Sequence, residues 1–557
     1  MPTSTPPRLD GNSLRPIADV AQDLGLAEAE WVPYGRDMAK VLLPGLEARR
    51  SRPDGKLVVV SSITPTPAGD GKTTMAIGLA QALCRSGARA VVTLREPSIG
   101  PMLGLKGGGT GGGRAQVVPM DRINLHFTGD LHAITAAHNL LAAVLDSRLH
   151  HGNDLGIDPQ QVLWQRALDM NDRALRHIVL GLGGRADGIP RESGFLITAA
   201  SEIMAVLCLA ESLADLRQRL GRMIVAFTRD GRPVAADALG VTGAMAALLR
   251  DAIHPNLAQT LEGTPALIHG GPFGNIAHGC NSVLATRMAL KLGDICLTEA
   301  GFGSDLGAEK FFDIKCRAEG LRPDAALIVV STRALKYHGG VPLKEVAGEN
   351  PDALARGLAN LDAHVECVRQ FGVPLLVGIN RYRTDTEREY RPVIDHCARL
   401  GVAAHVADVF EKGGDGGQDL ARGLLALLAS GPSRFAPLYP LDAPVKAKLD
   451  AIARRVYGAD GVVYPARVER QIAEIEALGY GGLPVSVAKT QRSLSDDPTL
   501  LGRPRGFRIT VNAVEISAGA GFLVAFAGDI ATMPGLPRRS NAENVDVAPD
   551  GSITGLI

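Results

Sequence analysis

Aromatic residues are scarce in this chain of 557 residues, and their scarcity excludes a core built on large rings. Only two tryptophans are present and aromatic residues make up 4% of the sequence, whereas 46% of the residues are hydrophobic. The cores must therefore be mostly aliphatic, and there is enough apolar side chain for large ones. At this length, roughly three or four domain-sized units are expected.

The cysteines lack the spacing of a metal or redox motif. There are seven, an odd number, and no two of them form a Cys-x-x-Cys pair. Most lie in apolar or helical surroundings, so we expect reduced, buried thiols and a cytoplasmic location rather than a disulfide framework. The positions are Cys84, Cys208, Cys280, Cys296, Cys316, Cys367 and Cys397.

The chain also lacks a net charge and a long apolar run. Lys+Arg and Asp+Glu both number 59, which gives no general attraction to nucleic acid or to an anionic membrane. No stretch reaches about 18 apolar residues without a charge, so no transmembrane helix is expected. The polar, proline-rich start at 1–10 lacks the apolar segment of a signal peptide. Any phosphate binding must therefore depend on local basic groups.

The stretch from Lys56 to Glu96 reads as strand, loop, helix and strand. An apolar run at 57–60 predicts a buried strand, helical spacing of apolar residues predicts a helix over 73–86, and a β-rich run predicts a strand over 88–94. Gly87 ends the helix. This arrangement places a phosphate group at the N-terminus of the helix.

The loop of this unit is similar to a phosphate-binding loop, with one departure. Gly69 and Gly71 allow backbone N–H groups to turn toward an anion. Lys72 would place a positive charge near β- and γ-phosphates, and the Thr73 hydroxyl suits Mg²⁺. The departure is Thr66, which stands where G-x-x-x-x-G-K-[ST] has its first glycine; the alternative is a glycine-rich turn with a solvated lysine. The expected nucleotide contacts are Thr66, Pro67, Ala68, Gly69, Asp70, Gly71, Lys72, Thr73 and Thr74.

A glycine run follows at 106–114, with the sequence Lys-Gly-Gly-Gly-Thr-Gly-Gly-Gly-Arg. So many glycines disfavour a helix or the interior of a strand. The run is either a mobile linker or a loop whose backbone closes on a ligand. Its basic ends, Lys106 and Arg114, favour an anion-facing loop.

Asp130 lies between a predicted strand at 123–127 and a predicted helix at 131–149. A carboxylate at such a place either reaches a bound cation or caps the helix. Three nearby histidines recur every six residues, and this spacing does not put two of them on one helix face. A zinc site is therefore not expected, and polar or core histidines are the better interpretation of His126, His132 and His138.

Strands alternate with helices as far as about residue 440, which predicts an α/β fold with a doubly wound, mostly parallel sheet. The predicted strands are 223–227, 265–268, 294–297, 325–330, 374–379 and 402–406, and the helices between them include 281–292 and 351–371. In such sheets ligands bind beyond the carboxyl ends of the strands. Polar or glycine-rich clusters follow four of these strands and predict one long crevice, lined by 269–275, 298–304, 380–385 and 408–414.

We predict three domains. The first, 1–360, is a large nucleotide-binding α/β domain of the phosphate-binding-loop type with a helical leader; the second, 361–440, is a smaller α/β domain; and the third, 441–557, is α+β. The leader is expected to hold helices at 17–26 and 31–48. In the third, helices at 446–457 and 466–478 precede β-rich segments at 484–488, 508–514 and 521–526.

Several long blocks resemble those of formate–tetrahydrofolate ligase, also called formyltetrahydrofolate synthetase. One runs from Leu-Arg-Glu-Pro-Ser-Ile-Gly-Pro through the glycine run to His-Phe-Thr-Gly-Asp, and another reads Arg-Ala-Leu-Lys-Tyr-His-Gly-Gly. The blocks are 64–74, 94–129, 262–281, 333–340, 488–498 and 517–537, so the resemblance covers essentially the whole chain beyond the first few dozen residues.

The resemblance implies a reaction in which formate attacks the γ-phosphate of ATP to give formyl phosphate. The amine of tetrahydrofolate then attacks this carbonyl, which gives 10-formyltetrahydrofolate, ADP and phosphate. It implies catalytic roles for Lys72, Arg95 and Glu96, with Arg95 holding formate through a fork that suits a planar carboxylate. It also implies Mg²⁺ at Thr73 and a monovalent cation, K⁺ or NH₄⁺, near Glu96 and Asp130. The alternative for Arg95 and Glu96 is a local ion pair at a strand end.

The resemblance further implies that the pterin ring of the folate lies between Tyr382 and Phe410. Members of the family usually have a Phe and a Trp at these places, so stacking is retained while folate affinity is less certain. Without the resemblance, each would be a loop aromatic. A cytoplasmic homotetramer with formate and tetrahydrofolate as substrates, and with no nucleic acid or membrane partner, is expected.

The rival interpretations are a P-loop ATPase or GTPase switch protein and a nucleotide-gated interaction protein. A guanine-reading Asn-Lys-x-Asp is not found, because 380–383 reads Asn-Arg-Tyr-Arg. Partitioning-type ATPase loops carry a second lysine five residues before Lys72, where this chain has Pro67. Turnover of ATP that needs formate and folate would exclude both rivals.

Overall fold

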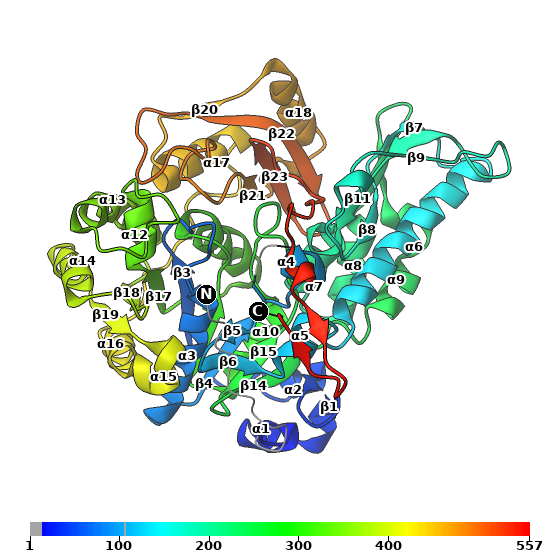
Figure 1. The fold of residues 1–557 in the computed structure, drawn as a ribbon. Helices are drawn as coiled ribbons and strands as arrows, with labels where there is room; N and C mark the ends of the chain where they lie inside the picture. The colour runs from blue at the N-terminus through cyan, green and yellow to red at the C-terminus, as the bar shows by residue number, and fades with distance from the viewer. Residues whose placement is uncertain (1–13, 105–106, 557) are drawn as a thin grey trace.

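A large mixed sheet forms the centre of the computed structural model, which describes residues 14–104 and 107–556 (Figure 1). The sheet has 12 strands, with the order β1-β2-β14-β15-β4-β16-β3-β17-β18-β19 and with β5 and β6 joined to it through β14. Every pairing from β15 to β19 is parallel. This confirms the predicted α/β class with a mostly parallel sheet. The parallel strands are β15 (Pro265–Ile268), β4 (Ala90–Leu94), β16 (Ile295–Glu299), β3 (Lys56–Ser62), β17 (Ala325–Val330), β18 (Leu375–Asn380) and β19 (Ala404–Ala407).

The sheet is covered on both faces, as β3 demonstrates. Its alternate residues enter two different cores: Leu57 and Val59 belong to one, Val58 and Val60 to the other. A strand buried on both faces needs a continuous apolar run, which is what the sequence provides. The helices connecting the parallel strands are α3 (Lys72–Arg85), α10 (Val283–Leu292), α12 (Thr332–His338), α13 (Pro351–Gln370) and α14 (Glu387–Arg399), and α16 (Gln418–Ala429) follows the last of these strands, β19.

One edge of the sheet is antiparallel, and here the helix predicted over 31–48 is wrong. The segment forms a hairpin of β1 (Trp31–Pro33) and β2 (Ala39–Val41), followed by the short α2 (Leu43–Glu47). The hairpin extends the sheet by pairing β2 with β14 (Asn256–Thr260). The cause is tertiary, since a distant strand supplies hydrogen bonds that the local pattern does not reveal. The helix predicted at 17–26 is present as α1 (Ile17–Asp23).

The strand predicted at 123–127 is also wrong, because this segment begins with α5 (Met120–Asn124). Ile123 and Phe127 are buried, and Leu125 between them is half-buried. This alternation of apolar residues is also typical of a strand, so the local pattern does not reveal the helix that begins at Met120. The glycine run contributes β5 (Gly111–Gly112), which pairs with β6 (Ala115–Val118), whereas Lys106 lies outside the described residues.

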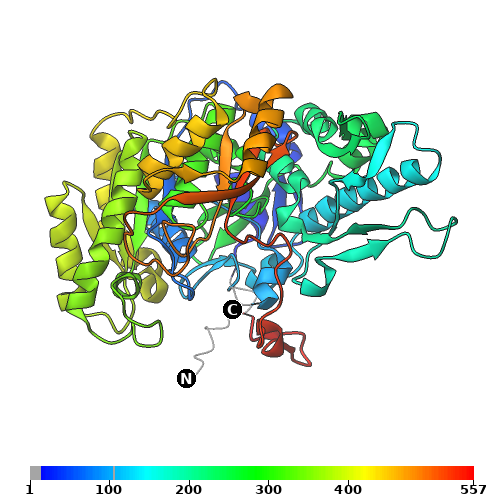
Figure 2. The same cartoon turned by 90° about the horizontal axis from the view of Figure 1, so that it is seen from above.

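A second unit extends from the main body, to the right in Figures 1 and 2. It has its own apolar core around α6 (Asp130–His150), α7 (Glu202–Leu209), α8 (Leu213–Arg222) and α9 (Thr242–Leu248). The strand predicted at 223–227 is present as β12 (Ile224–Thr228), but it does not join the parallel sheet. It pairs antiparallel with β7 (Ile157–Val162) and β13 (Pro233–Ala235).

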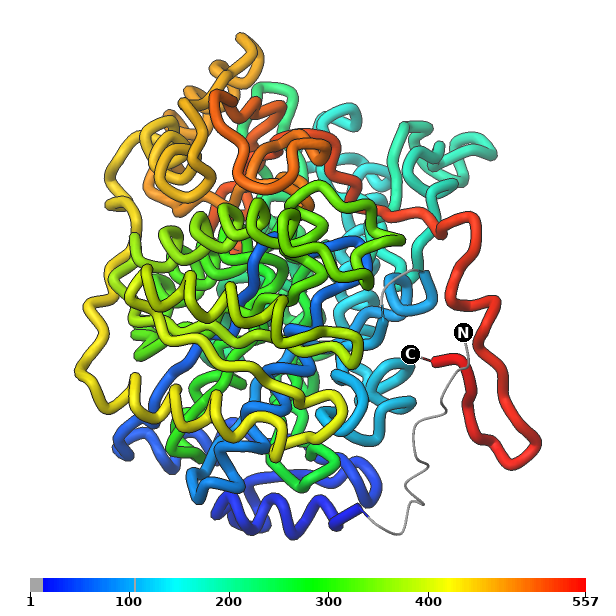
Figure 3. Tube along the Cα trace, turned by 60° about the vertical axis from the view of Figure 1, so that its left-hand side comes forward, coloured from blue at the N-terminus to red at the C-terminus, as the bar shows by residue number. Residues whose placement is uncertain are grey.

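The C-terminal part forms a third unit with a four-stranded sheet of order β20-β22-β23-β21. Figure 3 shows the last residues, in red, as an extended segment along the outside of the molecule. This segment is attached by hydrogen bonds such as that from Asn541 Nδ2 to the Met102 carbonyl, 3.0 Å. The elements are α17 (Val445–Ile452), a π-helical turn (Ala453–Tyr457), α18 (Ala466–Ala477), β20 (Val462–Val463), β21 (Val485–Ala488), β22 (Ile509–Ser517) and β23 (Phe522–Ala527).

One boundary of the predicted domain division, between residues 360 and 361, falls within a helix. Residue 361 falls inside α13, and strands on both sides of it belong to the main sheet.

Within 14–104 and 107–556, no helix is both long and apolar enough to cross a membrane. Six of the cysteines are buried and Cys84 is half-buried, all of them as free thiols.

The three histidines spaced by six residues lie in different surroundings. His126 and His132 are exposed. His138 is buried, stacks on Trp164 with a centroid distance of 4.3 Å, and shares a hydrogen bond with Ser201 Oγ, 2.9 Å. Burial lowers the pKa of His138 to about 3. His138 is therefore a neutral core histidine.

Candidate active site

The carboxyl ends of the parallel strands bring the candidate residues to one edge of the main sheet. Because β4, β16, β3, β17, β18 and β19 are neighbours and run in the same direction, the segments that follow them share this edge. The loop 64–71 follows β3, Arg95 follows β4, and Glu299 ends β16. Tyr382 follows β18 and Phe410 follows β19.

The loop between β3 and α3 makes its turns at two glycines. Gly69 has a φ of 80° and Gly71 a φ of 74°, a region that favours glycine. A Cβ at Gly71 would also lie 2.4 Å from Asn380 Nδ2. Thr66 does not have a positive φ, and its N–H donates to Asp70 Oδ2 (2.8 Å). The departure from the glycine pattern at Thr66 is thus accommodated inside the loop.

Asp70 is a buried residue of this loop. Its carboxylate also accepts a hydrogen bond from Ser331 Oγ, 3.2 Å, and its main-chain carbonyl accepts one from Asn380 Nδ2, 3.0 Å. Burial raises the pKa of Asp70. Pro67, Ala68 and Gly69 at the tip of the loop are exposed.

Lys72 is the first residue of α3, and its ammonium is directed to the segment at the end of β16. Nζ donates to the carbonyls of Ala300 (2.5 Å) and Phe302 (2.6 Å) and lies 3.8 Å from Glu299 Oε1. Burial lowers the pKa of Lys72 to about 8, although the Glu299 carboxylate opposes this shift. Thr73 and Thr74 lie in the same first helical turn, and Thr73 Oγ1 donates to Glu299 Oε2, 2.9 Å.

The side chains of Arg95 and Glu96, directly after β4, have different neighbours. Arg95 lies with a terminal nitrogen 3.8 Å from Glu299 Oε1, so its carboxylate partner is Glu299 and not its neighbour in sequence. The Glu96 carboxylate is buried near Asp130, and burial and the Asp130 charge raise its pKa well above the usual range. One of its oxygens, Oε2, is buried without a hydrogen-bond partner. The alternative of a local Arg95–Glu96 ion pair is wrong.

Asp130 begins α6 and forms a buried ion pair with Lys40, 2.8 Å between Nζ and Oδ1. Asn256 Nδ2 donates to its other oxygen, 2.8 Å. The residue at the helix cap is Gly129, and the donors to the Asp130 carboxylate are the Lys40 and Asn256 side chains rather than backbone N–H groups of α6. The capping alternative is therefore wrong, and the ammonium of Lys40 already neutralises Asp130.

The two aromatics lie on adjoining segments. Arg381 pairs with Asp408 at 2.7 Å and Arg383 with Glu411 at 2.9 Å, so two ion pairs join the residues on either side of Tyr382 to those around Phe410. One face of the Tyr382 ring is covered by the Arg333 guanidinium, 3.9 Å from the ring centroid.

The Phe410 side chain, by contrast, is half-exposed, at 50%. A Cβ at Gly113 would lie 2.2 Å from the Phe410 carbonyl oxygen, and the Arg114 N–H donates to that oxygen, 2.8 Å. The glycine run therefore packs against the segment that carries Phe410, which explains the need for glycine at position 113.

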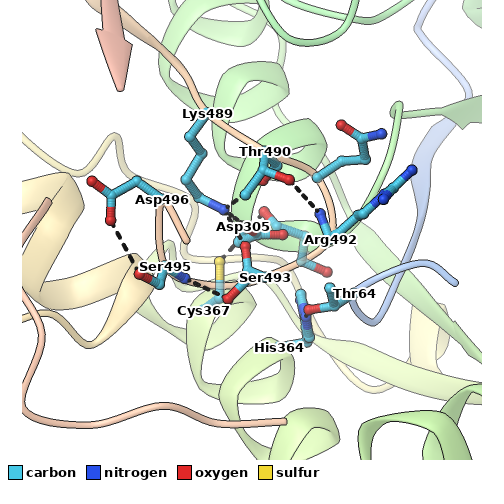
Figure 4. A network of polar contacts seen from close by, with 12 residues as sticks. Thr64, Asp305, His364, Cys367, Lys489, Thr490, Arg492, Ser493, Ser495 and Asp496 are labelled. Atoms are coloured by element: carbon cyan, nitrogen blue, oxygen red, sulfur yellow. Dashed lines mark hydrogen bonds and ion pairs between the residues drawn. The ribbon is translucent and has the colours of Figure 1, made fainter. Parts of the chain in front are cut away.

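A buried polar network attaches the C-terminal unit to the candidate site (Figure 4). Lys489, directly after β21, donates to Asp305 Oδ2 (2.8 Å) and to the Ser493 carbonyl (2.5 Å). Asp305 lies in a π-helical turn (Ser304–Ala308) that follows the Ala300 and Phe302 carbonyls which hold Lys72.

The same C-terminal loop also reaches the start of the nucleotide loop. His338 accepts from the Gly502 N–H (3.2 Å) and donates to the Thr64 carbonyl (2.8 Å). Asn360 Nδ2 donates to the Gly502 carbonyl (2.7 Å) and to Thr64 Oγ1 (3.0 Å). Residues 489–502 thus support both the start of the loop that precedes Lys72 and the turn that follows the carbonyls which hold its ammonium.

The sequence-based interpretation missed four residues of this site. Glu299 stood in the polar cluster that follows the predicted strand 294–297 but had no assigned role. Arg333 was part of a quoted block, and Asn380 part of a cluster. Lys40 gave no signal, because it lies in the segment where a helix was predicted.

The fold and this edge are those of an α/β enzyme that binds its substrates beyond the ends of parallel strands. The family model for formate–tetrahydrofolate ligase matches residues 10–557, essentially the whole chain. The chain belongs to the formate–tetrahydrofolate ligase family. It is therefore a ligase that forms a carbon–nitrogen bond, with formate and tetrahydrofolate as its substrates, and membership of a ligase family implies the use of ATP.

Proposed function

We propose that this protein joins formate to tetrahydrofolate by way of formyl phosphate, at the expense of ATP. The observation that carries the proposal is the convergence of Lys72 and Thr73, after β3, and of Arg95, after β4, on the buried carboxylate of Glu299 at the end of β16 between them. This geometry supports a site in which a polyphosphate and a small carboxylate meet.

The first step is phosphoryl transfer. An oxygen of formate attacks the γ-phosphorus, the bond to the β-phosphate oxygen breaks, and ADP leaves. Catalysis of this step is chiefly positioning and charge stabilisation. Lys72 is suited to the charge that develops on the γ-phosphate, because its ammonium is held at the N-terminus of α3 by two carbonyls that can release it. Arg95 is suited to formate, because one of its nitrogens, Nε, is buried without a partner.

The residues present fit a magnesium ion. Thr73 would hold it through Oγ1, and the ion would neutralise charge on the transferred phosphate. A monovalent cation fits less completely, since Asp130 is paired with Lys40, whereas the unpartnered Oε2 of Glu96 offers a ligand. We expect K⁺ or NH₄⁺ to raise the rate over that in Na⁺, and Glu96→Gln to weaken this response. Equal rates in all three salts would contradict the cation proposal.

The second step is acyl transfer. The folate amine attacks the carbonyl carbon of formyl phosphate, the carbon–oxygen bond to phosphate breaks, and the nitrogen loses its proton. Tyr382 and Phe410 would hold the flat pterin ring. Two observations support this role: the two residues lie on segments joined by ion pairs, and Phe410 is half-exposed. Because Arg333 covers one face of Tyr382, only the other face remains for the folate.

One assay tests the proposal. ATP, formate and tetrahydrofolate are supplied together and each is omitted in turn, and 10-formyltetrahydrofolate is measured. Product should require all three, and Lys72→Ala should reduce turnover by about 100- to 1000-fold, as expected for the loss of a charge donor to the transition state. Hydrolysis of ATP at the same rate without formate and folate would instead indicate the rival ATPase. The homotetramer, the cytoplasmic location and the three-domain division remain our proposals.

A further inference from the structure

Glu299 occupies a position that brings it within reach of three functional side chains at once. It is the last residue of β16, the strand that lies between β3 and β4. Its backbone is level with Val60 of β3, just before the nucleotide loop, and Arg95 follows β4 on the other side. A side chain at the end of this central strand therefore meets the segments that leave both neighbours.

The contacts of the carboxylate are unequal. It lies 3.8 Å from both Lys72 and Arg95, beyond hydrogen-bond distance, whereas Thr73 Oγ1 donates to it at 2.9 Å. Lys72 gives its hydrogen bonds to the Ala300 and Phe302 carbonyls instead. Glu299 is 5% exposed. Its direct partner among these groups is thus the threonine hydroxyl, and the two cations balance its charge at longer range.

This arrangement fixes which part of the hydroxyl remains for a ligand. A hydroxyl has one hydrogen to donate and two lone pairs that accept. Since the hydrogen of Thr73 is directed to Glu299, only the lone pairs face elsewhere, and lone pairs are what a magnesium ion requires. The same negative charge acts unfavourably on a polyphosphate that arrives without a metal, because it lies beside the lysine that would receive the phosphates.

We propose that Glu299 is a positioning residue that makes the site select the magnesium complex of the nucleotide over the metal-free nucleotide. It acts through Thr73, whose oxygen it orients, and through its own charge, which disfavours bare phosphates. The inference rests on the proposed binding of ATP at this loop.

The test compares nucleotide binding with and without metal in the full chain. Dissociation constants for a non-hydrolysable ATP analogue are measured by calorimetry with saturating Mg²⁺ and with EDTA, in the wild type, Glu299→Gln and Asp294→Asn. Asp294 is the matched control, because it is a carboxylate just before the other end of the same strand and pairs with Arg89 at the surface.

Glu299→Gln should lose about 10- to 100-fold of the enhancement that Mg²⁺ gives, as is usual when a group behind a metal ligand is removed. Its affinity for the metal-free analogue should be unchanged or higher. Asp294→Asn should match the wild type in both conditions. A merely structural role of Glu299 would weaken both affinities together, and that result, or an unaltered enhancement, overturns the proposal.

A second variant keeps the test decisive if Glu299→Gln folds poorly. Glu299→Asp retains the charge but withdraws the carboxylate from Thr73 by one methylene. It should lose several-fold of the magnesium enhancement while the metal-free affinity stays at the wild-type level; full retention of the enhancement overturns the role of the hydrogen bond. Failure of the wild type to bind the analogue in either condition would instead refute nucleotide binding at this loop, so the two failures are distinguishable.

Discussion

Replacing Lys489 by methionine should destabilise the protein strongly, because it leaves a buried carboxylate without its cation. Lys489 and Asp305 are 0% and 2% exposed and their charged atoms are 2.8 Å apart. Breaking such a pair by removing one partner costs about 3–5 kcal/mol. The carbonyls of Thr490 and Ser493 lose their donor as well, which supports a value near the middle of that range, about 4 kcal/mol.

The measurement is a urea titration followed by circular dichroism. For a chain of this length, a denaturant slope of about 4 kcal/mol per M converts the loss into a fall of about 1 M in the urea midpoint. Lys446→Met serves as the control, since it removes a lysine of the same unit whose partner, Glu469, is at the surface. An exposed pair contributes about 0–1 kcal/mol, so this midpoint should hardly move.

The double variant Lys489→Met with Asp305→Asn decides between a charge effect and a packing effect. Removing the orphaned charge should restore much of the lost stability, which gives a coupling energy of about 2–3 kcal/mol between the two sites. The reasoning is refuted if Lys489→Met shifts the midpoint no more than the surface control, or if the two substitutions add without coupling.

The remaining predictions concern the reaction. Arg95→Lys should be severely impaired in formate use although the charge is kept, because a guanidinium fork grips both oxygens; normal formate kinetics would make Arg95 structural. Since burial lowers the pKa of Lys72 to about 8, the protonated form is lost as pH rises, so kcat/KM for ATP should fall through about pH 8, and a flat profile from about pH 7 to 9 would contradict this. Truncating Tyr382 or Phe410 to alanine should raise KM for tetrahydrofolate by about tenfold, since stacking contributes about 0.5–1.5 kcal/mol beyond area burial, while KM for ATP stays constant; the reverse pattern would place the rings at the nucleotide. Phe410→Trp, which restores the usual family residue, should be tolerated and should not raise KM for tetrahydrofolate; a rise as large as that of Phe410→Ala would contradict stacking.

The nucleotide loop and its flanking elements could be predicted because their signals are local. The apolar run of β3, the glycines, and the helical spacing of α3 lie within about thirty residues, and each agrees with the next. The parallel strands from β15 to β19 follow the same logic, because a strand buried on both faces needs an apolar run.

The wrong helix at 31–48 and the missed contacts of Lys40 and Glu299 involve partners distant in the sequence. The hairpin of β1 and β2 depends on pairing with β14, more than two hundred residues later. Lys40 and Asp130 meet across 90 residues, and Glu299 meets Thr73 across 226. No window of the sequence contains both members of these pairs, so their contacts had to come from the structure.

The network around Lys489 has a consequence for the order in which the molecule becomes competent during synthesis. The loop at 64–74 leaves the ribosome early, yet its entrance at Thr64 and the turn at Asp305 are held by residues 489–502. A nascent chain that stops before them has strand, loop and helix in place, but the carbonyls that hold Lys72 lack their support. The last part of the chain to be made thus completes one of the first parts, and we expect no partly synthesised form to turn over ATP.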